Sequence, residues 1–512
     1  MDLNRGRVFL LICVAAFSFL YGIFTVPLFD LDEGAFSEAT REMIRSGNYL
    51  TTYLEGKLRF DKPILIYWFQ ALFANIFGIH EFVFRFPSVI SASIWLTLVY
   101  LFTKRYYGEV RAFWAGIVMS CSLLVTIVAK LAIADALLNM TLAASMFSIF
   151  LYRDTGDKRF IYTAHAAIGL GILTKGPVAI LIPFAVSFLF FLSVKDLKKW
   201  LVAVFNPMGL ALMIGIAAPW YVMEYIDQGM NFINGFIFKH NIGRFSDPME
   251  GHVGGIGYYV PVIIVSLMPF STLLYNMFRR VKEIWSTELE RYMLIWFLFV
   301  FLFFSFSGTK LPHYVLYGMT PLFILISKMF IDAKNPLAFT IPILLFLLIM
   351  LGIPLYLPPF IAGVEDEFAR AVAGAMIDRM EIFYFATVGA MTVFTFVSLF
   401  IRRISIRTRG VVFGIFMLFC ANVLLMPILG EARQRGVKEA AIYAKERGIR
   451  VNTWGSRMPS FSVYYDDIPG KEYPRPGEYF FTKVDKLDKI NYPYEVIKEW
   501  PAYRLVRIEE ME

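Results

Sequence analysis

Acidic and basic side chains stand together where apolar runs of this chain end. Asp32 and Glu33 follow the first apolar run, the Asp61-Lys62 pair lies in the next polar segment, and Asp135 begins a later run. This combination suits a substrate that carries phosphate, because cations bind phosphate oxygens while a carboxylate deprotonates an acceptor or orients a metal. A single ionisable residue at such a boundary more often just marks a helix end, so the argument depends on clustering.

Asp32 is the strongest candidate for a catalytic base. It begins a polar segment at the point where the first apolar run would leave a bilayer. A second interpretation is structural. Asp32 would be the N-cap of a helix over 33–46 and would accept hydrogen bonds from its first backbone N–H groups. The two roles are compatible.

The composition indicates a membrane protein. The chain has 512 residues, of which 58% are hydrophobic. The remaining polar residues are too few to cover the core of a soluble protein of this size. The net charge of +8 comes from short Lys and Arg clusters between apolar runs, which favours anionic lipid over nucleic acid as a partner. Cys13, Cys121 and Cys420 lie in apolar stretches, which supports neither a disulfide framework nor a thiolate metal site.

Apolar runs of spanning length recur along the chain, because a bilayer core takes about 20 residues as helix. The predicted spans number about thirteen on that criterion, and the first is interpreted as a retained helix and not a cleaved signal peptide. They cover 8–29, 83–103, 112–129, 136–152, 160–174, 177–194, 200–222, 254–277, 292–307, 312–330, 336–357, 382–401 and 410–429.

Basic residues cluster in every second connection between these spans. This alternation predicts a cytoplasmic N-terminus and an extracytoplasmic, or periplasmic, C-terminus in the plasma (inner) membrane. The acidic and basic clusters then share the outer face, together with the long outer segments 30–82 and 223–253. Within 30–82, the apolar positions of 36–44 recur at helical spacing and predict an amphipathic helix lying in the interface, and 223–253 is expected to resemble it.

The chain divides by composition into a transmembrane domain, 1–430, and a small extracytoplasmic α/β domain, 431–512. A helix is predicted over 437–446 and strands over 450–454, 462–465, 479–481 and 503–506. This second domain carries no recognisable catalytic or metal motif. Recognition of a partner or substrate is the role it suggests.

Five motifs in order resemble one family. They are Asp32-Glu33-Gly34-Ala35-Phe36 with the residues up to Met43, Phe60-Asp61-Lys62-Pro63, Leu173-Thr174-Lys175-Gly176-Pro177, Asn241-Ile242-Gly243-Arg244-Phe245 and Gly308-Thr309-Lys310-Leu311-Pro312-His313-Tyr314. Together they are similar to the GT-C glycosyltransferases, above all to the 4-amino-4-deoxy-L-arabinose lipid A transferases and, beyond them, the protein O-mannosyltransferases. The resemblance runs from about residue 8 to 330.

The resemblance implies an inverting transfer of a sugar from a polyprenyl-phosphate donor to lipid A, another glycan or a protein. Asp32 would be the essential acidic residue and Asp135 would support it. The residues expected to surround the donor phosphate or the acceptor are Glu33, Lys62, Lys175, Arg244, Lys310 and Tyr314.

The same resemblance implies a divalent metal near the phosphate, either zinc, magnesium or manganese, held by Asp61 and His240. The sequence also departs from the family pattern. The arabinose branch commonly has Glu at the position of Asp61, and an Arg-Tyr pair where Ala35 and Phe36 stand here. The aminoarabinose substrate is therefore not implied by the motifs.

Two other classes of protein would also have many spans. A polyprenyl-linked sugar transporter or flippase should place helix breaks or ionisable residues at the midplane of paired inverted repeats, and no such repeat is evident. A non-catalytic envelope assembly protein would not need Asp32, Lys62 and Lys175 together. Substitution of Asp32 by Asn separates these alternatives from an enzyme.

Overall fold

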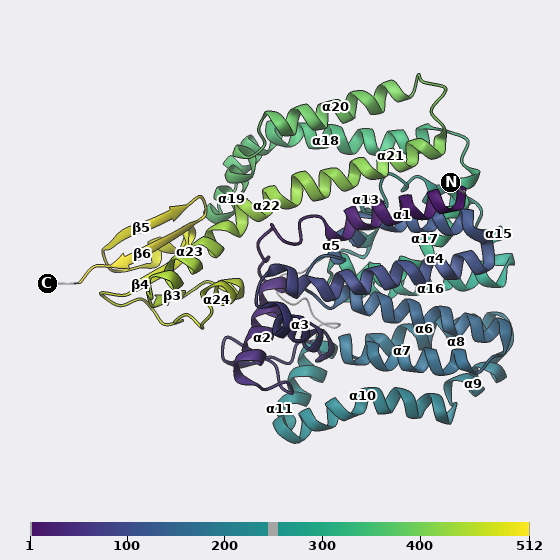
Figure 1. The fold of residues 1–512 in the computed structure, drawn as a ribbon, viewed down its shortest axis with the longest axis horizontal. Coiled ribbons are helices and arrows are strands. Elements are labelled where there is room, and N and C mark those ends of the chain that lie inside the picture. Colours follow the sequence, from purple (N-terminus) through teal and green to yellow (C-terminus); the bar gives the residue numbers. More distant parts are fainter. Residues whose placement is uncertain (1–2, 244–253, 511–512) are drawn as a thin grey trace.

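The structure, a computed structural model, describes residues 3–243 and 254–510. Long helices lie side by side in one bundle, and the end of the chain forms a smaller part at one end of it (Figure 1). The helices of the bundle are α1 (Leu3–Leu20), α4 (Glu81–Ser120), α6 (Asp135–Thr155), α7 (Arg159–Lys175), α8 (Val178–Ser193), α10 (Pro207–Gln228), α16 (Glu288–Ser305), α17 (Thr320–Asp332), α18 (Leu337–Ala362), α20 (Ile382–Ser398) and α21 (Ile406–Phe419).

Shorter elements connect the bundle helices and build one end of the molecule. The shorter α-helices are α2 (Asp32–Ser46), α3 (Leu65–Phe77), α5 (Leu123–Val128), α9 (Leu197–Val204), α11 (Met230–Phe232), α13 (Tyr259–Ser266), α14 (Leu273–Arg279), α15 (Val281–Ser286), α19 (Glu367–Asp378), α22 (Met426–Arg433), α23 (Arg435–Glu446) and α24 (Pro459–Tyr465). The π-helices are η1 (Ile233–Gly243) and η4 (Cys420–Leu425), and the 3-10 helices are η2 (Ile256–Tyr258), η3 (Pro312–Gly318) and η5 (Val484–Lys489).

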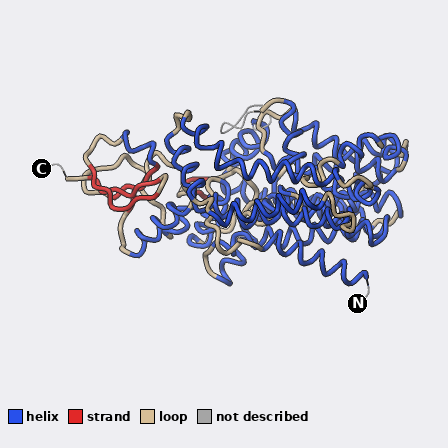
Figure 2. Tube along the Cα trace, turned by 90° about the horizontal axis from the view of Figure 1, so that it is seen from above, coloured by secondary structure: helices blue, strands red, loops and turns tan. Residues whose placement is uncertain are grey.

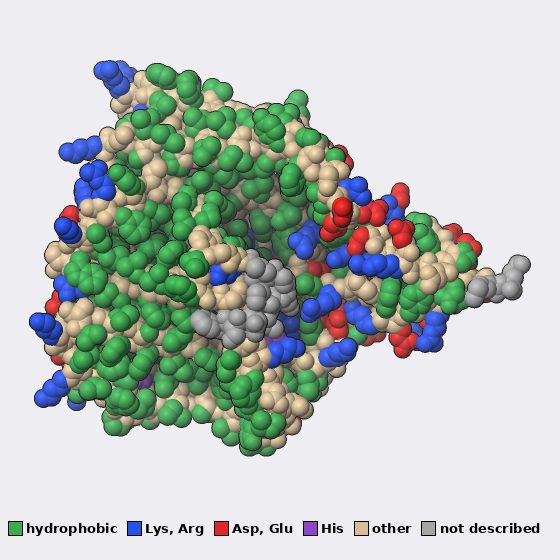
Figure 3. Space-filling view, turned by 180° about the vertical axis from the view of Figure 1, so that it is seen from behind, with side chains coloured by type: hydrophobic (Ala, Val, Ile, Leu, Met, Phe, Trp, Pro, Cys, Tyr) green, Lys and Arg blue, Asp and Glu red, His purple; other side chains and the backbone are tan. Residues whose placement is uncertain are grey.

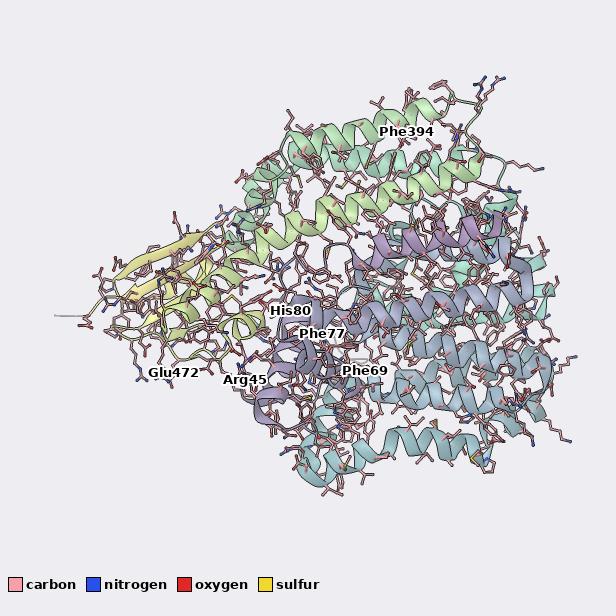
Figure 4. The ribbon with its side chains drawn as sticks, viewed as in Figure 1. Arg45, Phe69, Phe77, His80, Phe394 and Glu472 are labelled. Atoms are coloured by element: carbon pink, nitrogen blue, oxygen red, sulfur yellow. The ribbon has the colours of Figure 1, made fainter. Side chains whose placement is uncertain are left out.

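The outside of the bundle is apolar. Hydrophobic side chains cover its flank, while Lys and Arg side chains gather at the end away from the C-terminal segment (Figure 3). Phe69 and Phe77 of α3, labelled in Figure 4, are 36% and 56% exposed, and Phe394 of α20 is 42% exposed. Large apolar side chains left outside a folded protein in such numbers indicate contact with lipid.

Five described helices are long and apolar enough to cross a membrane, or up to seven if each of two bent pairs forms one span. This is fewer than the predicted thirteen because the helices divide differently. The predicted span 83–103 and the first half of 112–129 fall in α4, which bends at Gly108 (φ 80°), and most of the second half forms α5. Others form shorter helices, such as α8 with 16 residues.

Helix α2 occupies the predicted amphipathic stretch, and its position in the membrane interface stays a prediction. Glu33, Phe36, Ala39 and Met43 are all buried on it. The helix packs against α3 on one side and α24 on the other. The sequence pattern does not show the second contact, because α24 lies more than 400 residues further along the chain.

The C-terminal segment, residues 435–510, carries the larger sheet, at the opposite end of the molecule from the N-terminus (Figure 2). Its strands are β3 (Val451–Asn452), β4 (Tyr479–Lys483), β5 (Tyr494–Trp500) and β6 (Tyr503–Ile508), in the order β3-β4-β6-β5. Only the β3-β4 pair is parallel. A two-stranded hairpin, β1 (Tyr53–Leu54) and β2 (Lys57–Leu58), lies near α2 in the N-terminal part.

The predicted helix at 437–446 and the predicted strands at 479–481 and 503–506 are confirmed by α23, β4 and β6. The strand predicted over 450–454 is reduced to the two residues of β3. The strand predicted over 462–465 is wrong, because these residues continue helix α24, which Pro459 opens at its first turn. Strand β5 was missed, since a register shift between Val496 and Lys498 breaks its alternation.

Candidate active site

A cavity of about 930 Å³ opens where α2, the start of α6, η1, η3 and the C-terminal segment meet. Its charged side chains are Asp32, Glu55, Lys57, Arg59, Asp61, Lys62, Asp135, Lys175, Lys239, Arg457 and Lys471, with His240 and His313. Among the described residues the wall therefore has seven Lys or Arg against four Asp or Glu. Such a wall favours an anionic occupant.

Asp32 is the first residue of α2, and its exposed carboxylate lines the cavity. The predicted N-cap role is wrong, because the N-cap is Leu31 and no side chain caps the helix. Within the described ranges no hydrogen bond or ion pair engages this carboxylate. A carboxylate placed in this way at a cavity wall is available to accept a proton from a bound acceptor.

Glu33, the next residue, has a different role from the predicted substrate contact. Its side chain is 1% exposed and does not line the cavity. It receives two bonds from Arg85 of α4 (Nε to Oε1, 2.6 Å; Nη2 to Oε2, 2.8 Å) and backbone N–H bonds from Phe29 and Ala132, both 2.9 Å. Glu33 therefore joins the chain before α2 to the loop before α6, and so holds Asp32 and Asp135 at one wall.

Asp135 and Lys175, predicted from distant parts of the sequence, meet in a buried cluster. The Lys175 ammonium donates to Asp135 Oδ1 (2.6 Å) and to the Tyr317 hydroxyl (2.6 Å), which itself donates to the same Oδ1 (2.5 Å). His313 Nε2 lies 3.7 Å from this oxygen. Asp135 is thus engaged by its neighbours, and it positions Lys175 at the cavity wall.

Tyr314 packs against the same lysine. The Lys175 ammonium lies 5.5 Å from the Tyr314 ring centroid and 5.2 Å from that of Tyr317, within the range of cation–π attraction. Tyr314 is 6% exposed and borders the cavity. The structure therefore brings together Asp32, Asp135, Lys175 and Tyr314 as predicted.

The two predicted metal ligands also face each other. His240 Nδ1, on the π-helix η1, lies 3.2 Å from Asp61 Oδ1. The same carboxylate oxygen receives a bond from Lys62 Nζ (3.1 Å), and the other oxygen receives one from Arg59 Nη2 (3.1 Å). The Asp61 carboxylate is therefore in contact with three basic side chains.

Lys310 does not line the cavity, although its neighbours Thr309 and Leu311 do, and its substrate contact stays a prediction that the structure does not support. Its ammonium is buried and donates to the carbonyl oxygens of Ser305 (3.0 Å) and Ser307 (2.6 Å) at the end of α16. Helix ends leave carbonyl groups without intrahelical partners, and a lysine satisfies them here. Arg244, the remaining predicted substrate contact, lies outside the described residues.

Several side chains of the cavity were not predicted. His313 stands in a matched motif but had no assigned role, and Tyr317 contacts Asp135 and Lys175 behind the wall of this cavity; their spacing from Tyr314 on η3 was the available signal. Arg59 stands two residues before Asp61 but outside the quoted motif. Arg457 and Lys471 come from the C-terminal segment, and no local pattern indicates that they approach Asp32.

A second, more apolar cavity of about 490 Å³ adjoins the first. It shares Asp61, Lys62, Lys175, His240 and Tyr314 with the charged cavity. Its other walls are mostly apolar: Pro177, Val178, Leu181, Ile237, Ile242, Phe303 and Phe304 line it. A charged cavity that continues into an apolar one suits an amphiphile with an anionic head. The fold and the site therefore define a class: a helical membrane protein with an amphiphilic cavity.

Comparison with known proteins places this class more narrowly. Residues 61–222 match the family model described as dolichyl-phosphate-mannose-protein mannosyltransferase. An undecaprenyl phosphate-alpha-4-amino-4-deoxy-L-arabinose arabinosyl transferase of Wigglesworthia glossinidia brevipalpis is 31% identical over 330 residues, 62% of this chain and 58% of that protein. The chain thus spans a little over half the length of that relative. An uncharacterised protein of Aquifex aeolicus is 30% identical over 69% of this chain and 80% of its own length.

Solved structures share the fold. The ArnT protein of Cupriavidus metallidurans, crystallised with undecaprenyl phosphate, superposes with a TM-score of 0.82 at 18% identity, covering 98% of both chains. An archaeal oligosaccharyltransferase of Archaeoglobus fulgidus gives a TM-score of 0.51 at 11% identity, over 95% of this chain and 70% of that one. The chain belongs to the GT-C glycosyltransferase superfamily.

Proposed function

We propose that this protein is an inverting glycosyltransferase that moves a sugar from a polyprenyl-phosphate donor to an acceptor at the outer face of the membrane. The observation that carries the proposal is the pair of adjoining cavities, one charged with Asp32 in its wall and one apolar, with Lys62 and Lys175 where they meet. The name of the Wigglesworthia relative and the undecaprenyl phosphate bound by the Cupriavidus protein support the same donor class.

The proposed reaction begins with the donor's lipid chain in the apolar cavity and its phosphate between Lys62 and Lys175. Asp32 takes the proton from the acceptor hydroxyl as the acceptor oxygen attacks the anomeric carbon. The bond from that carbon to the phosphate oxygen breaks, and its electron pair leaves with the polyprenyl phosphate. The lysines stabilise the charge that gathers on the leaving phosphate, and attack from the opposite face inverts the anomeric centre.

The acceptor is proposed to enter the charged cavity from the side of the C-terminal segment. Lys57 and Arg457 line that side, where Lys471 pairs with Glu55 (2.9 Å), and the wall as a whole has seven Lys or Arg against four Asp or Glu among the described residues. This excess favours an anionic acceptor, such as lipid A or a phosphorylated glycan, over a neutral protein side chain.

We further propose thirteen membrane spans, with α4 counted as two helices on either side of Gly108. The N-terminus would be cytoplasmic, and residues 431–512 would form an α/β domain on the periplasmic side of the inner membrane. The basic end of the bundle, opposite the C-terminal segment, supports this orientation (Figure 3).

The test is a panel of radiolabelled polyprenyl-phosphate sugars offered to the full-length protein purified in detergent, with and without lipid A. Transfer or slow hydrolysis of one donor is the expected result, and it would also identify the sugar. Tight binding of every donor with no turnover of any would favour a flippase or an assembly protein instead.

A further inference from the structure

The Asp61 carboxylate is neutralised by the protein's own cations. Arg59 bonds to one oxygen and Lys62 to the other, each at 3.1 Å. The side chains of Arg59 and Lys62 are each 11% exposed, and that of Asp61 is 18% exposed. Both carboxylate oxygens are therefore engaged by cations in a mostly enclosed place, where charges interact more strongly than in water.

Among the described residues, a divalent metal at this place would find two side-chain ligands, Asp61 and His240, whose Nδ1 lies 3.2 Å from Asp61 Oδ1. Zinc in proteins takes three or four nitrogen, sulfur or oxygen ligands from side chains. Within residues 3–243 and 254–510 no cluster of three or more His, Cys, Asp or Glu could supply them. Magnesium needs fewer carboxylates when it also binds phosphate. At Asp61, however, it would have to replace the bonds from Arg59 and Lys62 or be repelled by their charges.

Arg59 is held in a fixed position. Its Nε donates to the Tyr67 hydroxyl at 3.2 Å, and its guanidinium lies 5.5 Å from the centroid of the Phe36 ring. Its backbone N–H donates to the Thr52 carbonyl at 2.9 Å. An arginine keeps its charge at any physiological pH. Arg59 borders the cavity, and its bonds to Tyr67 and Asp61 use Nε and one donor of Nη2, so a guanidinium with five N–H donors has further donors for a ligand.

We propose that Arg59, together with Lys62, does at this site what a divalent cation would do: it neutralises Asp61 and donates hydrogen bonds to the phosphate of the donor. Donor binding then needs no metal. The inference rests on the proposed polyprenyl-phosphate donor, and it assigns Arg59 as a phosphate-binding residue. The guanidinium suits this role because its fork of N–H groups matches two phosphate oxygens at once.

The experiment uses the full-length protein in detergent and undecaprenyl phosphate as the probe. Metal content is measured by mass spectrometry after purification, with and without the probe, so that a metal recruited by phosphate is also detected. Binding of the probe is then measured in EDTA and again with added zinc, magnesium or manganese. We expect no stoichiometric metal in either state, and the same dissociation constant with EDTA as with each ion.

The variant Arg59→Gln should weaken binding of the probe by roughly tenfold to a hundredfold, the value of one hydrogen bond to a charged group, and Arg59→Lys should recover part of it. Arg45→Gln is the matched control. Arg45 is a 58% exposed arginine of α2, near the C-terminal segment in Figure 4, and its guanidinium pairs with Asp466. Its loss should leave the dissociation constant unchanged.

One bound metal per chain, or loss of probe binding in EDTA, would overturn the inference and leave the donor class intact. An unchanged dissociation constant in folded Arg59→Gln would overturn the role of Arg59 alone. If the wild type binds no undecaprenyl phosphate with any ion, the donor class fails and the inference fails with it. The metal measurement on the wild type does not depend on whether a variant folds.

Discussion

Asp32 and Glu33 are neighbours in the sequence with opposite fates in the fold. The Asp32 carboxylate lines the cavity. The Glu33 side chain is 1% exposed, and its oxygens accept hydrogen bonds from Arg85 and from two backbone N–H groups. The sequence places both at the end of an apolar run, and that position carries no information on which one turns inward. Only the partner, Arg85, distinguishes them, and it lies 52 residues away.

Two buried lysines give a matched test of the site. Replacing Lys175 by Met removes the cation that Asp135 and Tyr317 position, so binding of undecaprenyl phosphate should weaken by about tenfold or more. Replacing Lys310 by Met removes the bonds to the carbonyl groups at the end of α16, so the melting temperature should fall while the dissociation constant stays the same. Titration of both variants in parallel checks this, and equal loss of binding would contradict the assignment of Lys310.

Helix α2 is fixed at its start by a buried ion pair to α4 and along its side by the C-terminal segment. Glu33 and Arg85 are 1% and 2% exposed. Asp30, just before the helix, accepts bonds from the backbone N–H (2.9 Å) and the hydroxyl (2.6 Å) of Ser460 on α24. The helix itself was predictable from its periodicity, but both contacts join residues far apart in the chain and were not.

Breaking the buried pair should be costly. Glu33→Ala leaves the Arg85 guanidinium buried without its carboxylate, a change that typically destabilises a protein by about 3–5 kcal/mol. The melting temperature in detergent should drop accordingly, and replacing both residues by leucine should recover part of the loss. A double-mutant cycle measures the coupling between Glu33 and Arg85. It compares each single change to leucine with the double variant, and additive losses of stability would show that the pair does not act as a unit.

The contact between Asp30 and α24 should depend on pH. Burial raises the pKa of Asp30 to about 6, although the bonds from Ser460 and the charge of Arg433 oppose the shift. Because the folded protein favours the protonated acid, the contribution of Asp30 to stability is full below its usual pKa near 4, falls as the pH rises to about 6, and is constant above that. Melting temperatures from pH 4 to 7 should decline less in Asp30→Asn than in the wild type, and parallel curves would refute the assignment.

The surface of the molecule has three regions of different composition (Figures 1 and 3). The flank is apolar, the end with the N-terminus is basic, and the C-terminal segment at the other end is charged. Composition alone predicts the membrane class, and ordered motifs predict the superfamily. The break at Gly108 and the bounds of α8 agree with the predicted limits between 83–103 and 112–129 and with the predicted span 177–194. The number of spans stays a prediction, because helices as short as the 16 residues of α8 are below the usual length of a span.

The proposed orientation is testable with two single cysteines. Cys121 and Cys420 are buried, and Cys13 would be replaced by serine. A cysteine in place of Arg475, whose side chain is 70% exposed, should react with a membrane-impermeant maleimide once the outer membrane is opened. A cysteine in place of Arg402 should react only after the inner membrane is also permeabilised, and the reverse order would invert the topology.

The most direct measurement compares wild type with Asp32→Asn in a single turnover with the donor that the panel identifies. Asn keeps the size of the side chain but cannot accept the proton of the acceptor. The rate of sugar transfer should fall by about 10²- to 10⁴-fold, the usual contribution of a general base, with the melting temperature and the affinity for undecaprenyl phosphate unchanged. Transfer at the wild-type rate by the folded variant would contradict Asp32 as the base and with it the proposed mechanism.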